Sequence, residues 1–210
     1  MAKDWYRKNT WTKDDEIEFF AKLKRSQKHK KPQYLRIQAL TLYETGDAQL
    51  LDVALNLLQK YFDEYPDDKF ERSSAYKILG DIYSKMEKFD ISLQNYKSAL
   101  DYEEIFPQVL SNAYLSYAKL IIQLNKTELF EGVEKLLSDR TIGLDFPKVK
   151  YIKNAILSII SKQKNDFEKA NYYKNIANEA ANAEVSGFRW HKKLGLVHDR
   201  DKLLDELMNN

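Results

Sequence analysis

Apolar residues in this chain recur at steps of three and four positions, which is the spacing of one face of an α-helix. The stretch after Thr12 is typical: acidic residues fill what would be the first turn, and Ile17, Phe20 and Leu23 follow at helical intervals. Thr12 suits an N-cap because its hydroxyl can accept a hydrogen bond from an unpaired backbone amide. Acidic side chains also favour the positive end of the helix dipole. We therefore predict a helix that begins just after Thr12.

The same period continues along the chain, and few residues interrupt it, since there are only six glycines and four prolines. Pro32, Pro107 and Pro147 each stand before a new periodic run, where proline fits the first helical turn. The runs predict ten helices, at residues 13–26, 33–45, 48–64, 69–86, 88–104, 108–124, 127–138, 148–163, 166–184 and 200–208. β-Branched residues do not alternate with polar ones over any useful length, so no strand is predicted and the fold class is all-α.

Residues 73–104 carry a spaced set of aromatic, small and aliphatic residues. The set is Tyr76, Leu79, Gly80 and Tyr83, followed by Phe89, Ser92, Tyr96 and Ala99. It resembles the tetratricopeptide repeat (TPR), a helix hairpin with the pattern W-x2-L-G-x2-Y and then A-x3-F. The spacing fits at every anchor, although tyrosine replaces Trp and Phe and serine replaces Ala. Glu104 stands where the pattern has its closing proline.

Weaker matches to the second TPR helix occur on either side of this segment. Their small residues form a series at intervals of 38 to 40 residues: Ala54, Ser92, Gly132 and Ala170. Small side chains at these places would let paired helices approach closely. The resemblance covers residues 33–184 and implies a right-handed α-solenoid of about four TPR-like helix hairpins. An irregular helical bundle, or another repeat class such as HEAT with units of about 40 to 47 residues, is the alternative.

The two flanks, residues 1–32 and 185–210, lie outside the repeat match. Because a repeat array has an open apolar face at each end, we predict that they form an N-terminal aromatic segment with a capping helix and a C-terminal capping segment. The residues assigned to capping are Trp5, Tyr6, Trp11, Phe188 and Trp190. The packing sites predicted for them are Phe19, Phe20 and Tyr34 at the front, and Tyr173 and Ile176 at the back. Together with residues 33–39, the flanks are similar to a group of uncharacterised bacterial TPR proteins.

Charge adds little to this picture. Thirty-four Lys and Arg stand against 32 Asp and Glu, and a net charge of +2 gives no overall attraction to nucleic acid or to membranes. Residues 22–31 hold six Lys or Arg that could bind phosphates, but a helix end is the favoured interpretation, since cations complement the dipole there. No apolar stretch reaches the roughly 20 residues of a membrane span, and no export signal is visible. We expect a cytoplasmic protein without a membrane partner.

Catalytic and cofactor motifs are absent from the sequence. There is no cysteine, which excludes thiol chemistry, and three histidines are too few for a His-rich metal site. No phosphate-binding loop, dinucleotide fingerprint, zinc-protease helix or nucleophile elbow is present. Adjacent carboxylates such as Glu103 and Glu104 do not converge on one point of a helix. We therefore expect no enzymatic activity, no cofactor and no metal.

The TPR resemblance implies that the chain binds a protein or a peptide. TPR domains use the concave surface formed by their first helices, and the residues predicted there are Arg36, Tyr43, Lys77, Asp81, Tyr114 and Tyr117. Chaperone-binding TPRs have an asparagine at the position of Asp81, and the charge of Asp81 would repel a terminal carboxylate. Arg189 and Trp190 are a further candidate, because Trp and Arg dominate binding hot spots. With Arg7 and His191 they would form a recognition patch instead of a cap.

The predicted function is a non-catalytic protein–protein interaction module. The alternative among binding proteins is an immunity or regulatory protein that neutralises one specific partner, which a tight one-to-one complex would favour. A nucleic-acid-binding helical repeat protein that uses residues 22–31 is the lesser alternative, and salt-dependent retention on nucleic acid would favour it. An enzyme would need a deep polar pocket with perturbed titratable groups.

Overall fold

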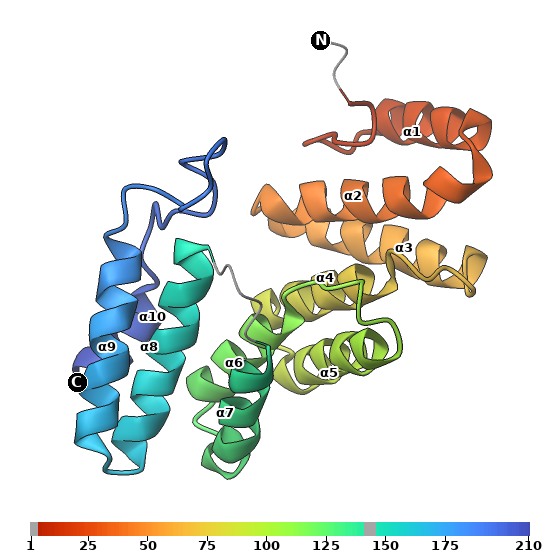
Figure 1. Ribbon diagram of the computed structural model, residues 1–210. Helices are drawn as coiled ribbons and strands as arrows, with labels where there is room; N and C mark the ends of the chain where they lie inside the picture. The colour runs from red at the N-terminus through yellow and green to blue at the C-terminus, as the bar shows by residue number, and fades with distance from the viewer. Residues whose placement is uncertain (1–3, 141–145) are drawn as a thin grey trace. The chain divides into compact units, whose positions relative to one another are not determined.

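A computed structural model describes residues 4–140 and 146–210 (Figure 1). Within these ranges every regular element is helical, which confirms the predicted all-α class. Residues 1–3 of the predicted N-terminal segment and residues 141–145 of the predicted repeat region lie outside the described residues. The chain divides into two compact units, unit 1 up to residue 113 and unit 2 from residue 114, and each is described by itself.

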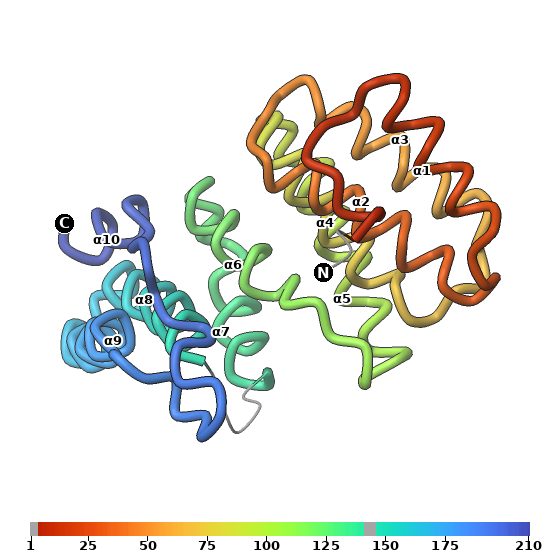
Figure 2. Tube along the Cα trace, turned by 90° about the horizontal axis from the view of Figure 1, so that it is seen from above, coloured from red at the N-terminus to blue at the C-terminus, as the bar shows by residue number. Residues whose placement is uncertain are grey.

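Unit 1 consists of a first helix and two helix hairpins. Its helices are α1 (Lys13–Arg25), α2 (Lys31–Glu44), α3 (Ala48–Glu64), α4 (Arg72–Lys85) and α5 (Phe89–Ile105), with the 3₁₀ turn η1 (Lys28–Lys30) before α2. Helices α2 and α3 lie side by side, as do α4 and α5, and the connections can be followed in Figure 2. Fully buried side chains from α1 to α4 form one core, among them Phe19, Leu35, Leu58, Tyr61 and Ile82. This core gives unit 1 a continuous apolar interior.

Unit 2 contains a helix hairpin, two shorter helices before it and a short C-terminal helix. Its elements are α6 (Ala113–Gln123), η2 (Thr127–Leu129), α7 (Phe130–Asp139), α8 (Pro147–Gln163), α9 (Phe167–Ala181) and α10 (Lys202–Asn209). Helices α8 and α9 lie side by side in both views (Figures 1 and 2), and α10 packs on α8. Every helix of the chain begins within three residues of its predicted start, except α6.

Helix α6 begins at Ala113, so the predicted start at residue 108 is wrong. The carboxylate of Glu103, which is 2% exposed, accepts hydrogen bonds from the Ser111 amide at 2.8 Å and the Ser111 hydroxyl at 2.6 Å. Asn112 then takes a left-handed backbone conformation with φ 61°. These contacts hold the segment after Pro107 as a loop, because a buried carboxylate needs hydrogen-bond donors that a helix would have used internally.

The hairpin of α4 and α5 has the close helix contact predicted from its small residues. A Cβ added to Gly80 would lie 2.4 Å from ring atoms of Tyr96, so no larger residue fits there. The Ser92 hydroxyl crosses the same contact and donates a hydrogen bond to the Gly80 carbonyl at 2.7 Å. Ala99 is fully buried one turn beyond Tyr96. The predictions for Gly80, Ser92 and Ala99 are therefore confirmed.

In unit 2 the predicted close contacts are found at α9 but not at α7. Ala170 is 6% exposed, and its carbonyl accepts a hydrogen bond from the Ser158 hydroxyl of α8 at 2.8 Å. Gly132, by contrast, is exposed, and a Cβ added there would meet nothing within 4 Å. Helix α7 instead turns Val133 and Leu137 inward. The prediction that Gly132 allows a close approach is wrong, because Gly132 lies off the buried face of α7, which is formed by Phe130, Val133 and Leu137.

Candidate functional site

The segment before α1 packs its tryptophans onto α1 and α2. The ring centroid of Trp5 lies 5.4 Å from that of Phe19 and 4.9 Å from that of Tyr34. Trp11 lies 5.3 Å from Phe19 and 6.3 Å from Phe20. The edge-to-face geometry of Trp5 with Tyr34, and of Trp11 with both phenylalanines, is favourable beyond simple burial. The predicted packing of the N-terminal segment near Phe19, Phe20 and Tyr34 is therefore confirmed.

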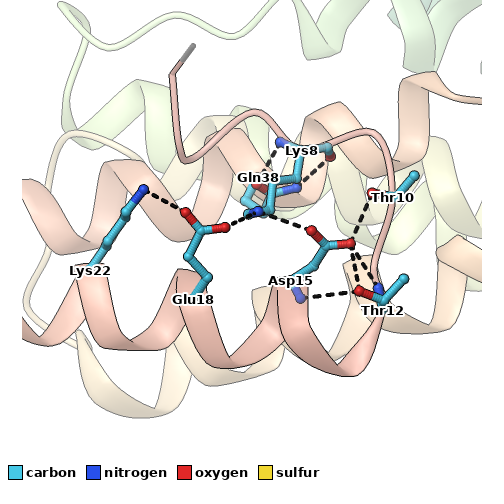
Figure 3. A network of polar contacts seen from close by, with 7 residues as sticks. All are labelled: Lys8, Thr10, Thr12, Asp15, Glu18, Lys22 and Gln38. Carbon is cyan, nitrogen blue, oxygen red and sulfur yellow. Dashed lines mark hydrogen bonds and ion pairs between the residues drawn. The ribbon is translucent and has the colours of Figure 1, made fainter. Parts of the chain in front are cut away.

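A buried glutamine fixes the backbone of the same segment. Gln38 of α2 is fully buried, and its side-chain amide donates to the Lys8 carbonyl at 2.8 Å while accepting from the Lys8 N–H at 2.9 Å (Figure 3). The Lys8 ammonium binds the carboxylates of Asp15, at 2.9 Å, and Glu18. Sequence analysis missed Gln38, although one signal was available: it is a polar residue at an apolar position of the helical period, between Leu35 and Leu42.

Asp15 completes this polar network at the start of α1. Its carboxylate accepts from the Thr12 amide at 3.0 Å, and the Thr12 hydroxyl accepts from the Asp15 amide at 3.2 Å, which is a capping box (Figure 3). The Thr12 amide, the Lys8 ammonium and the Thr10 hydroxyl together hold the pKa of Asp15 far below its usual value. A surface hollow of about 460 Å³ lies here, but its polar groups already satisfy one another. The hollow is therefore explained by capping alone.

Four of the six predicted groove residues lie on α2 and α4, which contact each other in unit 1. Arg36 binds Glu71 in an ion pair in which both side chains are mostly buried. Lys77 donates to Asp81 at 2.6 Å, and Asp81 also accepts from the Tyr96 hydroxyl at 2.8 Å. Burial and the charge of Asp81 raise the pKa of Tyr96 above its usual value. Asp81 thus supports the helix hairpin whether or not it touches a partner.

Tyr43 is the aromatic member of the α2 and α4 surface. Its ring is half-buried, and the Lys85 ammonium lies 5.9 Å from its centroid. Burial first, and then the charges of Asp81 and Glu44, raise the pKa of Tyr43 to about 12. The lysine is fixed in place because it also donates to the Gly46 carbonyl at 3.0 Å. This surface is therefore preorganised, with charged groups held by partners of their own.

The remaining two groove candidates lie in the other unit. Tyr114 is 5% exposed and Tyr117 is half-buried, and both belong to α6. The burial of Tyr114 agrees with a role in helix packing. The structure does not place either residue with the α2 and α4 surface, so their contribution to a groove stays a prediction.

The basic run at residues 22–31 occupies the end of α1 and the turn that follows. Lys22, Lys24 and Arg25 fall in the last turn of the helix, where cations complement the dipole. Lys22 also binds Glu18 at 2.6 Å, and Lys31 donates to the Lys24 carbonyl at 3.1 Å. These positions agree with the interpretation of the run as a helix end.

The C-terminal helix is fixed by a cluster around Tyr151 of α8. The Tyr151 hydroxyl donates to the Asp205 carboxylate at 2.9 Å and accepts from the Asp201 amide at 3.0 Å. The Arg200 guanidinium binds both oxygens of Asp205, at 2.7 Å and 2.9 Å, and lies 5.3 Å from the Tyr151 ring centroid. Burial and then Asp205 raise the pKa of Tyr151 to about 12, whereas Arg200 lowers the pKa of Asp205. Helix α10 therefore covers this part of α8.

The segment between α9 and α10 has two aromatic residues with opposite environments. Phe188 stacks on Phe146, just before α8, with ring centroids 4.6 Å apart. Trp190 is 80% exposed, so its predicted role as a cap is wrong. The Arg189 guanidinium lies 5.0 Å from the Trp190 ring centroid, and the predicted pairing of these two residues is present. The predicted packing of the C-terminal segment on Tyr173 and Ile176 stays a prediction.

Within residues 4–140 and 146–210, no group of three or more His, Cys, Asp or Glu side chains could hold a metal ion. No helix in the same ranges is both long and apolar enough to cross a membrane.

Comparison with known proteins gives one informative similarity. No protein-family model matches the chain, and no solved structure matches it. The chain is 33% identical over 101 residues to the NASP-related protein sim3 of Schizosaccharomyces pombe. The match covers 41% of this chain but only 26% of the relative. The relative is a TPR-containing protein, which agrees with the TPR resemblance, but it comes from a yeast, so the likeness to bacterial TPR proteins is unconfirmed.

Proposed function

We propose that this chain is a non-catalytic, TPR-like interaction module that binds a protein or peptide partner. The observation that carries the proposal is the hairpin of α4 and α5, in which Gly80 lies against Tyr96 and Ser92 binds the Gly80 carbonyl at 2.7 Å. These are the places where the TPR pattern requires small residues, because its paired helices approach closely there. The similarity to a NASP-related protein supports the same class.

The proposal extends to the arrangement of the helices. The hairpins α2/α3, α4/α5, α6/α7 and α8/α9 would be successive units of a right-handed α-solenoid, within residues 33–184. Residues 1–32 and 185–210 would be its terminal segments. Each unit of such an array contacts its neighbours only, so its curved surface is extended and preformed. A partner would therefore be captured without covalent chemistry.

The partner-binding surface we propose is formed by first helices of the hairpins, with Tyr114 and Tyr117 of α6 added to the α2 and α4 residues. In unit 1, Lys77 is the residue best placed to act, because its side chain is 27% exposed while Asp81 is 9% exposed. A partner carboxylate can share the Lys77 ammonium, which has three donors, without breaking the Tyr96 bond to Asp81. Tyr43, on the neighbouring helix α2, offers an apolar ring, and Tyr is a frequent hot-spot residue.

The test compares two lysines on opposite helices of one hairpin. The full chain, its Lys77→Ala variant and its Lys97→Ala variant are immobilised, and proteins retained from a lysate are identified by mass spectrometry. Lys97 is exposed on α5, so it controls for loss of one positive charge. We expect a partner that the parent and Lys97→Ala retain and that binds Lys77→Ala about tenfold more weakly. Far-UV circular dichroism of each variant shows whether the helices are intact.

The other possible results of this experiment would each indicate a different binding site or a different function. Equal retention by all three proteins would exclude the α2 and α4 surface as the binding site. A single partner held in a tight one-to-one complex would favour an immunity or regulatory protein. Retention of nucleic acid that is lost steeply with added salt, and that requires the lysines of residues 22–31, would favour the nucleic-acid alternative.

A further inference from the structure

Residues 185–195 form the middle of the connection between α9 and α10 (Figure 1), and hydrogen bonds within the segment close it into a fixed loop. Ser186 is 7% exposed and closes the loop with two bonds: its amide donates to the Lys192 carbonyl at 2.7 Å, and its hydroxyl donates to the His191 carbonyl at 2.6 Å. The Phe188 amide donates back to the Ser186 hydroxyl at 3.2 Å. Gly187 has φ 81°, a conformation that suits glycine and lets the chain reverse here.

The loop is also tied to the start of α8. The ring of Phe146 stacks on Phe188 and lies so close to Gly195 that a Cβ added there would come within 2.5 Å of it. The Gly195 carbonyl accepts a hydrogen bond from the Lys148 amide at 2.8 Å. Both ends of the loop are therefore held, and little conformational freedom is left to lose when a ligand binds.

What this fixed loop presents to solvent is apolar and cationic. Trp190 is 80% exposed and Leu194 is 55% exposed, although large apolar side chains are normally buried. Both line a surface hollow of about 620 Å³ whose other lining residues are Arg189, His191, Lys192 and Lys193. The Arg189 guanidinium lies 5.0 Å from the Trp190 ring centroid, in a cation–π contact.

The charge of the loop is unbalanced. No Asp or Glu occurs between Glu184 and Asp199 in the sequence. Over the described residues, no ion pair of Arg189, Lys192 or Lys193 is found, whereas lysines such as Lys8 and Lys119 are paired. A cationic surface with an exposed indole attracts a ligand that carries negative charge and an apolar side chain.

We propose that the loop at residues 185–195 docks an acidic peptide segment of a partner protein that carries an aromatic or aliphatic anchor. The anchor packs on Trp190 and Leu194, and flanking carboxylates bind Lys192 and Lys193. Trp and Arg at the centre of a small patch are the composition of a protein-binding hot spot. A nucleic acid is disfavoured because three cations and one exposed ring fall short of the several phosphate contacts that such binding needs. A lipid surface is disfavoured because interfacial binding needs a larger apolar face.

The test measures binding of a synthetic peptide to the full chain by fluorescence anisotropy. The probe is fluorescein-labelled EEDEFLEEDE, and two companion peptides separate the contributions: one has Phe and Leu replaced by Ser, and the other has each acidic residue replaced by its amide. We expect the parent to bind the probe about tenfold more tightly than either companion. Trp190→Ala and the double variant Lys192→Glu with Lys193→Glu should each weaken probe binding about tenfold or more.

A matched double variant controls for net charge. Lys88→Glu with Lys97→Glu changes the charge equally at exposed positions of unit 1, and it should bind the probe within about twofold of the parent. Equal weakening in this control would overturn the proposal, because the attraction would then be non-specific. The proposal also fails if Trp190→Ala binds the probe as the parent does. It fails equally if single-stranded DNA or phosphatidylserine vesicles compete with the probe at lower concentration than the unlabelled peptide.

This inference stands apart from the proposed groove. Lys77→Ala should leave probe binding unchanged, because Lys77 is not one of the residues that line the hollow of the loop. A chain that binds the probe but retains no partner on the α2 and α4 surface would therefore refute the proposed α2 and α4 binding surface and leave the loop proposal standing.

Discussion

The two terminal regions of this chain use tryptophan in opposite ways. At the front, Trp5 and Trp11 lie within 5.5 Å of Phe19 between ring centroids, and a buried amide fixes the backbone beside them. At the back, Trp190 is 80% exposed on a loop that is equally well fixed. The difference shows that an aromatic residue outside a repeat match is not a cap by its type alone. The role of such a residue depends on whether the backbone around it directs the side chain inward or towards solvent.

The C-terminal region covers its apolar surface by other means. Helix α10 buries Leu204 and Met208, and its polar residues bind a tyrosine hydroxyl instead of stacking rings. The N-terminal segment therefore packs on its unit mainly through aromatic rings, and the C-terminal helix packs on α8 through an amphipathic face and a hydrogen-bonded cluster. Trp190 takes no part in this covering, since it is 80% exposed.

The largest expected effect is the loss of the N-terminal segment. Deleting residues 1–11 should lower the free energy of unfolding by about 3–5 kcal/mol, because it removes three half-buried rings, those of Trp5, Tyr6 and Trp11, and leaves Phe19 and Tyr34 uncovered. Urea denaturation followed by far-UV circular dichroism measures the change. An unchanged midpoint would mean that the aromatic contacts of this segment contribute nothing to stability, and the contrast between the two ends would then fail.

A single residue should reproduce much of that loss. Gln38→Ala should cost about 2–3 kcal/mol, because it creates a cavity and leaves the amide and carbonyl of Lys8 without their partners. Gln94→Ala, at an exposed position of α5, is the matched control and should cost less than about 0.5 kcal/mol. The emission of Trp5 and Trp11 should also shift to longer wavelength in Gln38→Ala if the segment detaches. Similar stabilities for the two variants would contradict the role assigned to Gln38.

At the other end, removing one hydroxyl should have a smaller, pH-dependent effect. Tyr151→Phe should cost about 1–2 kcal/mol near neutral pH, because the bonds to Asp205 and to the Asp201 amide are lost. The pKa of Tyr151 is raised to about 12 from 10.0, so its neutral form stabilises the fold below pH 10. That contribution should decline as the pH rises from 10 towards 12.

The measurement is the difference in unfolding free energy between the parent and Tyr151→Phe as a function of pH. We expect a constant difference below pH 10 and a decreasing one above it, since the phenylalanine variant has no hydroxyl to ionise at this position. Tyr172→Phe, at a ring that is 61% exposed, should show no such trend. If the difference in unfolding free energy stayed constant up to pH 12, the Tyr151 cluster would not be what holds α10 on α8.

Much of the helical framework could be predicted from the sequence, because helix formation and apolar period are local properties. The capping box at Thr12 and the close contact at Gly80 follow from residue types at fixed spacings. The start of α6 could not be predicted in this way, since it depends on Glu103, whose carboxylate binds Ser111 across the loop. The prediction of a close helix contact at Gly132 was wrong for a similar reason, because tertiary packing decides which face of α7 is buried.

The candidate site was less predictable than the framework. Arg36 looks like an available cation in the sequence, but it binds Glu71, which lies 35 positions away. Asp81 looks like a surface charge, but the fold uses it as the acceptor of the Tyr96 hydroxyl. Long-range pairing of this kind leaves no local pattern. Trp190 is the converse case, since its residue type suggested burial and the loop geometry directs it outward.

The smallest expected effect completes the contrast between the ends. Trp190→Ala should change the free energy of unfolding by less than about 0.5 kcal/mol, because its ring is 80% exposed and little apolar area is buried around it. Trp11→Ala is the matched control, and it should cost about 2 kcal/mol through the loss of its contacts with Phe19 and Phe20. Acrylamide quenching of tryptophan fluorescence offers an independent check, because the sequence has only three tryptophans. The parent should show a fraction of emission that acrylamide quenches readily, and this fraction should be missing in Trp190→Ala. A loss of stability in Trp190→Ala as large as that in Trp11→Ala would show that both ends are capped by tryptophan, and the loop would then have no ring to offer a partner.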